Sequence, residues 1–225
     1  MKSALRSTLL CSALIVLAGC ANSRVDPSEY SGFLKDYSRL KEAESISGAP
    51  VMRWISPNFK AANYKQVYIE PSQFYPKPQP TDVITPQTLQ QITHYYDTAL
   101  KRELGAVVPL ATGPGPNVLV VRPAITAVAT HTEGLKPYEV IPIALVTAAV
   151  MTAAGGRDQD VDIATEAAIL DGGNNTVVAQ VVRKGAGTEL ENKTTKLTVK
   201  DVQPVLDGWA SDMRRSLVKF RSEAR

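Results

Sequence analysis

The stretch "VDIATEAAIL" at residues 161–170 alternates apolar and polar side chains, and the turn-forming sequence "DGGNN" follows it at 171–175. A period of two is typical of a strand with one buried face. The next segment, "TVVAQVVRKG" at 176–185, has the composition of a returning strand. The sequence therefore predicts a β-hairpin over residues 161–185, and this hairpin decides the fold class.

Further elements are predicted on both sides of the hairpin. "KQVYIEPSQFY" at 65–75 and "NVLVVRPAITAVAT" at 117–130 are expected to be strands, the second central in the sheet. A helix between them begins at Pro86, with Thr85 as its cap. A last helix begins near Asp201, which can cap it. Its apolar face repeats at spacings of three and four: Val202, Val205, Leu206, Trp209, Met213, Leu217 and Phe220.

The order of these elements predicts an α+β fold with two layers. A four-stranded mixed sheet would carry the two main helices on one face. "SGFLKDYSRLK" at 31–41 has apolar residues at helical spacing, which predicts a short amphipathic helix lying on the body. "VMRWISPNF" at 51–59 is expected to be extended outside the sheet.

Length and charge restrict the class of protein. The chain has 225 residues, which suits one domain over 33–225 plus a leader. Its net charge is +3, with acidic and basic residues mixed along the chain. This balance gives no reason to expect a nucleic-acid partner or an anionic substrate.

The N-terminus has the pattern of a lipoprotein signal peptide. Lys2 and Arg6 precede the apolar run 9–19, and "LAGC" at 17–20 resembles the bacterial lipobox. The resemblance implies removal of residues 1–19 and attachment of diacylglycerol and an N-acyl chain to Cys20. Residues 20–32 would then form a lipidated tether, and multiple acyl chains would hold the protein stably on a membrane.

The residue after the lipidated cysteine bears on localisation. Ala21 stands where an Asp would typically retain a lipoprotein in the inner membrane. The protein is therefore expected on the outer membrane, facing the periplasm. Cys11 leaves with the leader and Cys20 is acylated, so no thiol remains for a disulfide, a metal or a nucleophile.

The run "VIPIALVTAAVMTAAGG" at 140–156 holds no charged residue. It is shorter than the roughly twenty apolar residues of a membrane-spanning helix. Two interpretations stay open: an insertion buried against the sheet, or an exposed surface for self-association or an envelope partner. The candidate contact residues are Ile143, Leu145, Val146 and Val150, together with Trp54, which could instead plug the open face of the sheet.

Candidate catalytic and metal-binding residues are few. The chain contains no HExxH motif, no GxSxG motif and no cysteine pair. Its histidines, His94 and His131, are expected at a helix surface and in a loop. Asp158, Asp160 and Asp162 could form a cation or hydrolase site, although such alternation usually marks a solvent face. We therefore predict no enzyme activity, no metal and no cofactor beyond the covalent lipid.

Four separated segments resemble a known family in order along the chain. They are "SGFLKDYSRLK" after the lipobox, "RWISPN" at 53–58, "VYIEP" at 67–71 and "IATEAAILDGGNNTVVAQ" at 163–180. Together they resemble the bacterial lipoproteins of domain-of-unknown-function family 3313, over about residues 30–220. The resemblance implies no activity.

These observations favour a membrane-anchored envelope lipoprotein that acts as a non-enzymatic accessory or interaction protein. The alternative function is a periplasmic module that binds a lipid or another apolar ligand, with the run 140–156 as part of its binding surface. The membrane is the partner that the lipobox implies.

Overall fold

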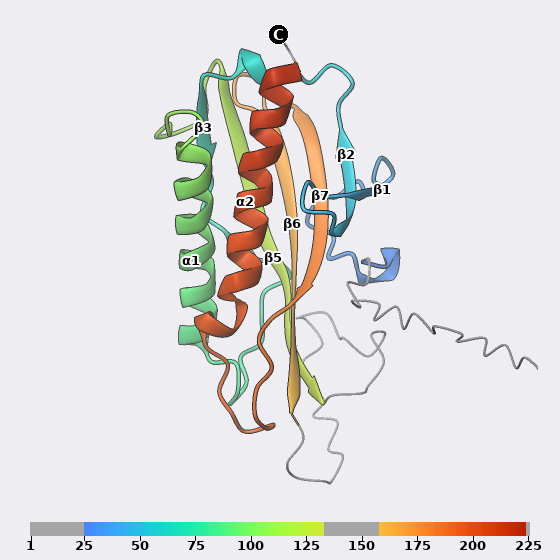
Figure 1. Ribbon diagram of the computed structural model, residues 1–225, viewed down its shortest axis with the longest axis vertical. Coiled ribbons are helices and arrows are strands. Elements are labelled where there is room, and N and C mark those ends of the chain that lie inside the picture. The colour runs from blue at the N-terminus through green and yellow to red at the C-terminus, as the bar shows by residue number, and fades with distance from the viewer. Residues whose placement is uncertain (1–24, 133–157, 224–225) are drawn as a thin grey trace, which may run out of the picture.

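The computed structural model describes residues 25–132 and 158–223. Figure 1 shows an open sheet with two helices on one face, α1 (Pro86–Gly105) and α2 (Val199–Glu223). Two short 3-10 turns, η1 (Pro27–Glu29) and η2 (Ala61–Asn63), lie outside these layers. Among the described residues, neither helix has the long apolar stretch needed to cross a membrane. The predicted α+β class, with two helices on one face, is confirmed.

The sheet has seven strands rather than the predicted four. β3 and β4 run parallel to β5, and the other neighbours are antiparallel. β4 (Gln73–Phe74) pairs with β5 beside the main path. The order along that path is β1 (Lys41–Glu44), β2 (Pro50–Ile55), β7 (Val177–Ala186), β6 (Gln159–Asp171), β5 (Val118–Thr132) and β3 (Gln66–Ile69).

The missed strands are short and lack the alternation that reveals a strand in a sequence. β1 reads "KEAE", and its charged side chains suit an exposed sheet edge, where they discourage pairing with another chain. β2 is extended as predicted, but it belongs to the sheet, where Arg53 stands opposite Val181 of β7. The four-strand count was therefore wrong because tertiary pairing, rather than local pattern, recruits these segments.

The elements with strong local signals are where the sequence places them. β6 and β7 form the predicted hairpin, with Ala167 opposite Val181. β5 lies inside the sheet between β6 and β3. Thr85 caps α1 by accepting a hydrogen bond from the backbone N–H of Thr88 at 3.1 Å. Periodicity and capping chemistry are therefore sufficient to locate these elements.

The cap of α2 differs from the prediction. The helix begins at Val199, so Asp201 lies within its first turn. The Asp201 carboxylate accepts hydrogen bonds from the backbone N–H and the hydroxyl of Thr198, at 2.7 and 2.8 Å. In a simple Asp cap, the carboxylate precedes the helix and accepts from N–H groups inside it. Here the carboxylate lies inside the first turn and accepts from the residue before the helix.

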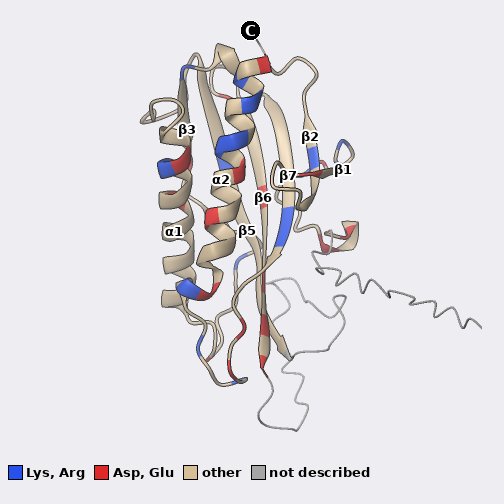
Figure 2. Ribbon diagram, in the orientation of Figure 1, with Lys and Arg blue, Asp and Glu red and all other residues tan. Residues whose placement is uncertain are grey.

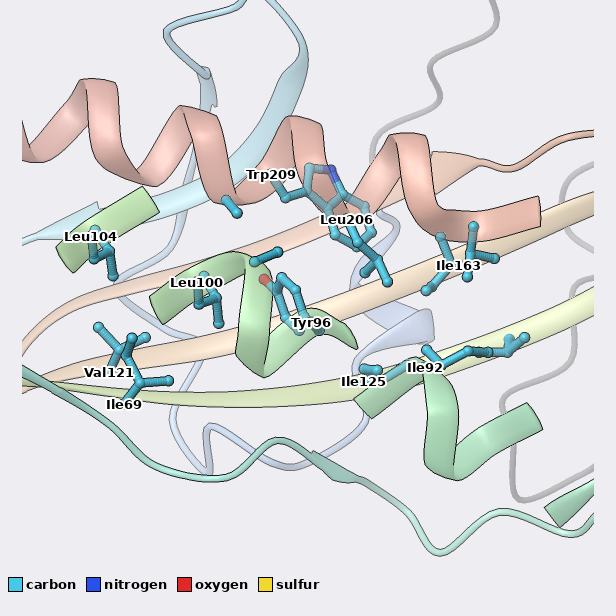
Figure 3. Packing of buried hydrophobic residues seen from close by; sticks show 14 of the residues in the cluster. Ile69, Ile92, Tyr96, Leu100, Leu104, Val121, Ile125, Ile163, Leu206 and Trp209 are labelled. Atoms are coloured by element: carbon cyan, nitrogen blue, oxygen red, sulfur yellow. The ribbon is translucent and has the colours of Figure 1, made fainter. Parts of the chain in front are cut away.

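The main core lies between the helices and the sheet. Figure 3 shows Leu206 and Trp209 of α2 close to Tyr96 of α1, and Leu100 of α1 and Ile163 of β6 belong to the same cluster. The Tyr96 and Trp209 rings meet edge to face, with centroids 6.5 Å apart. The predicted apolar stripe of α2 is thus the face that packs against α1 and the sheet.

A second apolar cluster covers the opposite face of the sheet. It joins residues 25–40, which we call the N-terminal segment, to β5, β6 and β7. The predicted short helix is wrong, because this segment forms turns and Lys35 has a left-handed backbone conformation with φ of 64°. Its apolar side chains, including Leu34 and Leu40, are nevertheless buried on the sheet.

Candidate functional site

Several predicted site residues lie outside the described part of the chain. They are Cys20 and the candidate contact residues Ile143, Leu145, Val146 and Val150. Their roles in lipidation, in an interface or in apolar-ligand binding stay predictions. The run that contains the last four connects the end of β5 to the start of β6.

Trp54 is half-buried in β2 and packs in the second apolar cluster. The Arg39 guanidinium lies over its ring, 3.8 Å from the ring centroid, and also donates a hydrogen bond to Gln180 at 3.3 Å. A cation stacked on an indole stabilises the contact between the two segments. Trp54 therefore holds the N-terminal segment against the open face of the sheet.

The predicted acidic group surrounds a histidine at the far end of the hairpin. His131 lies in β5 rather than in a loop, and its ring nitrogens are 3.3 Å from Asp160 and 3.8 Å from Asp162. Asp158 is exposed. Burial raises the pKa of the Asp162 carboxyl, and Lys184 and His131 oppose this rise. Among the described residues, no group of three or more potential ligands is arranged to hold a metal.

Glu166 is the site residue that the alternation pattern missed. Its odd-numbered neighbours in β6 face the helices, so the alternation predicts an exposed side chain; instead it is fully buried under the N-terminal segment. One carboxylate oxygen accepts a hydrogen bond from the Ser31 backbone N–H at 2.9 Å, and the other from the Tyr37 hydroxyl at 2.6 Å. The buried carboxylate thus obtains its hydrogen bonds from the segment that covers it, as a buried charge requires.

Tyr37 organises the segment around this carboxylate. While its hydroxyl donates to Glu166, it accepts hydrogen bonds from the backbone N–H groups of Gly32 at 2.7 Å and Leu34 at 3.3 Å. Its ring stacks on Tyr30, with centroids 4.4 Å apart and planes inclined by 12°. One side chain therefore fixes both the local turn and its attachment to the sheet.

The Tyr37→Phe variant removes the hydroxyl from this arrangement. Because a hydrogen bond to a charged group contributes about 1.5–3 kcal/mol, the free energy of unfolding should fall by about that amount. Urea denaturation followed by circular dichroism measures the loss. Tyr75→Phe is the matched control, since Tyr75 is 40% exposed and should change stability by less than about 0.5 kcal/mol. Equal losses in the two variants would contradict the role of Tyr37.

Two tyrosines should make the folded protein less stable at alkaline pH. Burial, followed by the hydrogen bond to Glu166, raises the pKa of Tyr37 to about 12. Burial, followed by the hydrogen bond to Asp171, raises the pKa of Tyr64 to about 12. An unfolded chain releases a tyrosine proton near pH 10, so this stabilisation is complete below about pH 10 and lost as the pH rises toward about 12.

The urea midpoint should therefore fall between about pH 10 and pH 12 in the wild-type protein. It should fall less steeply in the Tyr37→Phe, Tyr64→Phe double variant, which has neither group to titrate. An equally steep fall in both proteins would assign the alkaline transition to other groups.

The start of the described chain is also attached to the sheet. Val25 is only 6% exposed, and it lines a small cavity with Glu29 and Lys184. The Lys184 ammonium forms an ion pair with Glu29 at 3.0 Å. Residues 25–32, which the sequence assigns to a tether, therefore pack on the domain.

Comparison with known proteins identifies the family. The family model "Protein of unknown function (DUF3313)" matches residues 29–213. The chain belongs to this family. A relative from Escherichia coli (strain K12), the uncharacterized lipoprotein YdcL, is 39% identical over 199 residues, which cover 88% of this chain and 90% of the relative. The likeness agrees with the lipoprotein pattern at the N-terminus and with the family resemblance of the four segments.

The family match includes both partners of the buried contact. It begins at Glu29 and extends over Tyr37, Glu166 and most of α2. Residues 29–40 of the N-terminal segment are accordingly part of the family domain.

Distant likenesses concern solved structures of bacterial proteins. A PelC dodecamer from Paraburkholderia phytofirmans shares 10% identity, with a TM-score of 0.37 over 73% of this chain and 96% of that one. A minor lipoprotein from Acinetobacter baumannii shares 15% identity, with a TM-score of 0.36 over 70% and 93% of the two chains. Similarities this low carry no functional argument.

Proposed function

We propose that this member of the family is a lipid-anchored protein of the outer membrane that faces the periplasm and acts as a non-enzymatic accessory or interaction protein. The lipobox resemblance supports the anchor at Cys20, and Ala21 supports the outer membrane as its destination. The lipoprotein relative supports an envelope location.

The packing of Val25 is the observation that carries the proposal. This residue is buried only five positions after Cys20, and the following residues continue along the sheet. A fold whose first described residue packs so close to the lipobox cysteine leaves only a short linker between the domain and its anchor. The N-terminal segment thus serves two purposes, because it completes the fold and it holds the fold at the membrane.

Fractionation of cells tests the anchor and its destination. The wild-type protein should sediment with the outer membrane, and globomycin should cause the unprocessed precursor to accumulate. Cys20→Ser removes the acylated thiol and should release the protein from that fraction. Ala21→Asp keeps the thiol and should move the protein to the inner membrane. A soluble wild-type pool, unaffected by globomycin, would contradict the anchor.

The interaction part of the proposal rests on the uncharged run at 140–156. A charged residue placed in an apolar interface should weaken it, because the charge loses its hydration on association. The soluble Cys20→Ser form should therefore have a larger mass in solution, or capture more partner in cells, than its Leu145→Asp and Val150→Asp derivatives. An unchanged mass and unchanged in-cell crosslinks would reject this interface.

A further inference from the structure

The length of chain before Val25 restricts how the domain can stand on a membrane. Val25 follows Cys20 by five positions, and a fully extended chain covers those five steps in at most about 18 Å. A free tether over residues 20–32 would have reached about 45 Å. The packing of residues 25–32 therefore brings the point of attachment much closer to the anchor.

The point of attachment belongs to one face of the sheet. Val25 and η1 lie beside β6 and β7, where the Glu29–Lys184 ion pair fixes them. Strand alternation directs Glu166 and Lys184 toward the N-terminal segment, whereas Ile163 and Arg183 point toward the helices. The anchor therefore joins the domain on the face opposite α1 and α2.

The exposed side chains of this face suit lipid headgroups rather than hydrocarbon. Within the N-terminal segment, Asp26, Ser28, Lys35 and Asp36 are exposed. Its apolar side chains are directed into the second cluster on the sheet. Figure 2 shows acidic residues in η1 and basic residues on the neighbouring strand β7, whereas the charged residues of α1 and α2 belong to the helical side of the sheet. A surface of this kind rests at the polar boundary of a bilayer, because burying its charges in hydrocarbon would be unfavourable.

We propose that the N-terminal segment is a membrane-apposed surface whose partner is the phospholipid headgroup layer, and that α1 and α2 are directed away from the membrane. This orientation rests on the proposed lipid anchor at Cys20. The outer side of the helices lies roughly 20 Å beyond the sheet face, given the usual layer spacing and helix diameter. The helical layer is then the side open to periplasmic partners.

Site-specific quenching in vesicles tests the orientation. The lipidated protein would be reconstituted into phosphatidylethanolamine–phosphatidylglycerol vesicles that contain a lipid with a nitroxide on its headgroup. A fluorophore would be attached at Lys35→Cys in the N-terminal segment, at Gln91→Cys on the outer side of α1, or at Val218→Cys on the exposed side of α2. All three positions are exposed. Quenching should be strong at Lys35 and lost at Gln91 and Val218.

A longer tether provides the matched control. An insertion of about 20 Gly and Ser residues after Asn22 has a root-mean-square span of about 25 Å. It should abolish the strong quenching at Lys35 without releasing the protein from the vesicles. Equal quenching at all three positions, or stronger quenching at Gln91 or Val218, would overturn the orientation. Failure of the wild-type protein to sediment with the vesicles would instead overturn the lipid anchor itself, and the orientation with it.

Discussion

The Asp212→Ala variant should lose about 3–5 kcal/mol of unfolding free energy, because removing one partner of a buried ion pair leaves the other charge uncompensated. Asp212 of α2 is 2% exposed. Its carboxylate accepts hydrogen bonds from Arg183 of β7 at 3.4 Å and from Arg215 at 2.6 Å. It also accepts one from the Ser47 hydroxyl, between β1 and β2, at 2.7 Å. Asp212 thus connects α2 to β7 and to the turn between β1 and β2.

Arg183 explains why the loss should be large. This side chain is almost completely buried, and burial lowers the pKa of its guanidinium, against which the charge of Asp212 acts. Without Asp212 the buried cation would be left without its counter-ion, or water would have to enter to solvate it. Chemical denaturation at neutral pH measures the effect. Asp82→Ala, at an exposed position before α1, is the control and should change stability by less than about 0.5 kcal/mol. A loss below about 1 kcal/mol in Asp212→Ala would show that the pair is not needed.

The Leu206→Ala variant should lose about 2–5 kcal/mol through the cavity that it leaves between the helices and the sheet. Leu206 is completely buried, and Figure 3 places it between Trp209 and the Ile163 strand position. Val218→Ala on the same helix is the matched control, because Val218 is 47% exposed. The control should change stability by less than about 0.5 kcal/mol. Similar losses in the two variants would contradict the packing of α2 on the sheet.

Local patterns were sufficient for the helical half of the fold. The spacing of Leu206, Trp209 and Leu217 predicts which face of α2 is buried, and Thr85 with Pro86 predicts where α1 begins. The hairpin of β6 and β7 follows from its alternation and its turn. These signals are local because each depends on a few neighbouring residues and on one partner layer.

The other face of the sheet was not predictable in the same way. The alternation in β6 places Glu166 on a solvent face, because the predicted sheet has only one covered side. The sequence of β6 does indicate that both faces of the strand are buried, because four apolar residues follow one another: Ala167, Ala168, Ile169 and Leu170. Strands buried on both faces have such runs. The cover itself is formed by turns whose conformation depends on Tyr37 and Lys35, and no periodic pattern reveals it.

The predicted acidic site shows a related limit. Asp160 and Asp162 share a strand face, as the alternation predicts, but the sequence could not show that His131 would lie between them from the neighbouring strand. Strand register across β5 and β6 depends on a bulge between Ile125 and Ala127, which shifts every later pair by one residue. A long-range register of this kind is set by tertiary packing.

The mass of the mature N-terminal peptide, isolated from the membranes of its host, tests the lipid-anchored arrangement most directly. The peptide should begin at Cys20 and carry the mass of one diacylglyceryl group and one additional acyl chain, while the Cys20→Ser protein should yield no acylated peptide. An unmodified Cys20, or a mature N-terminus at another residue, would contradict the anchor on which the membrane-apposed N-terminal segment depends.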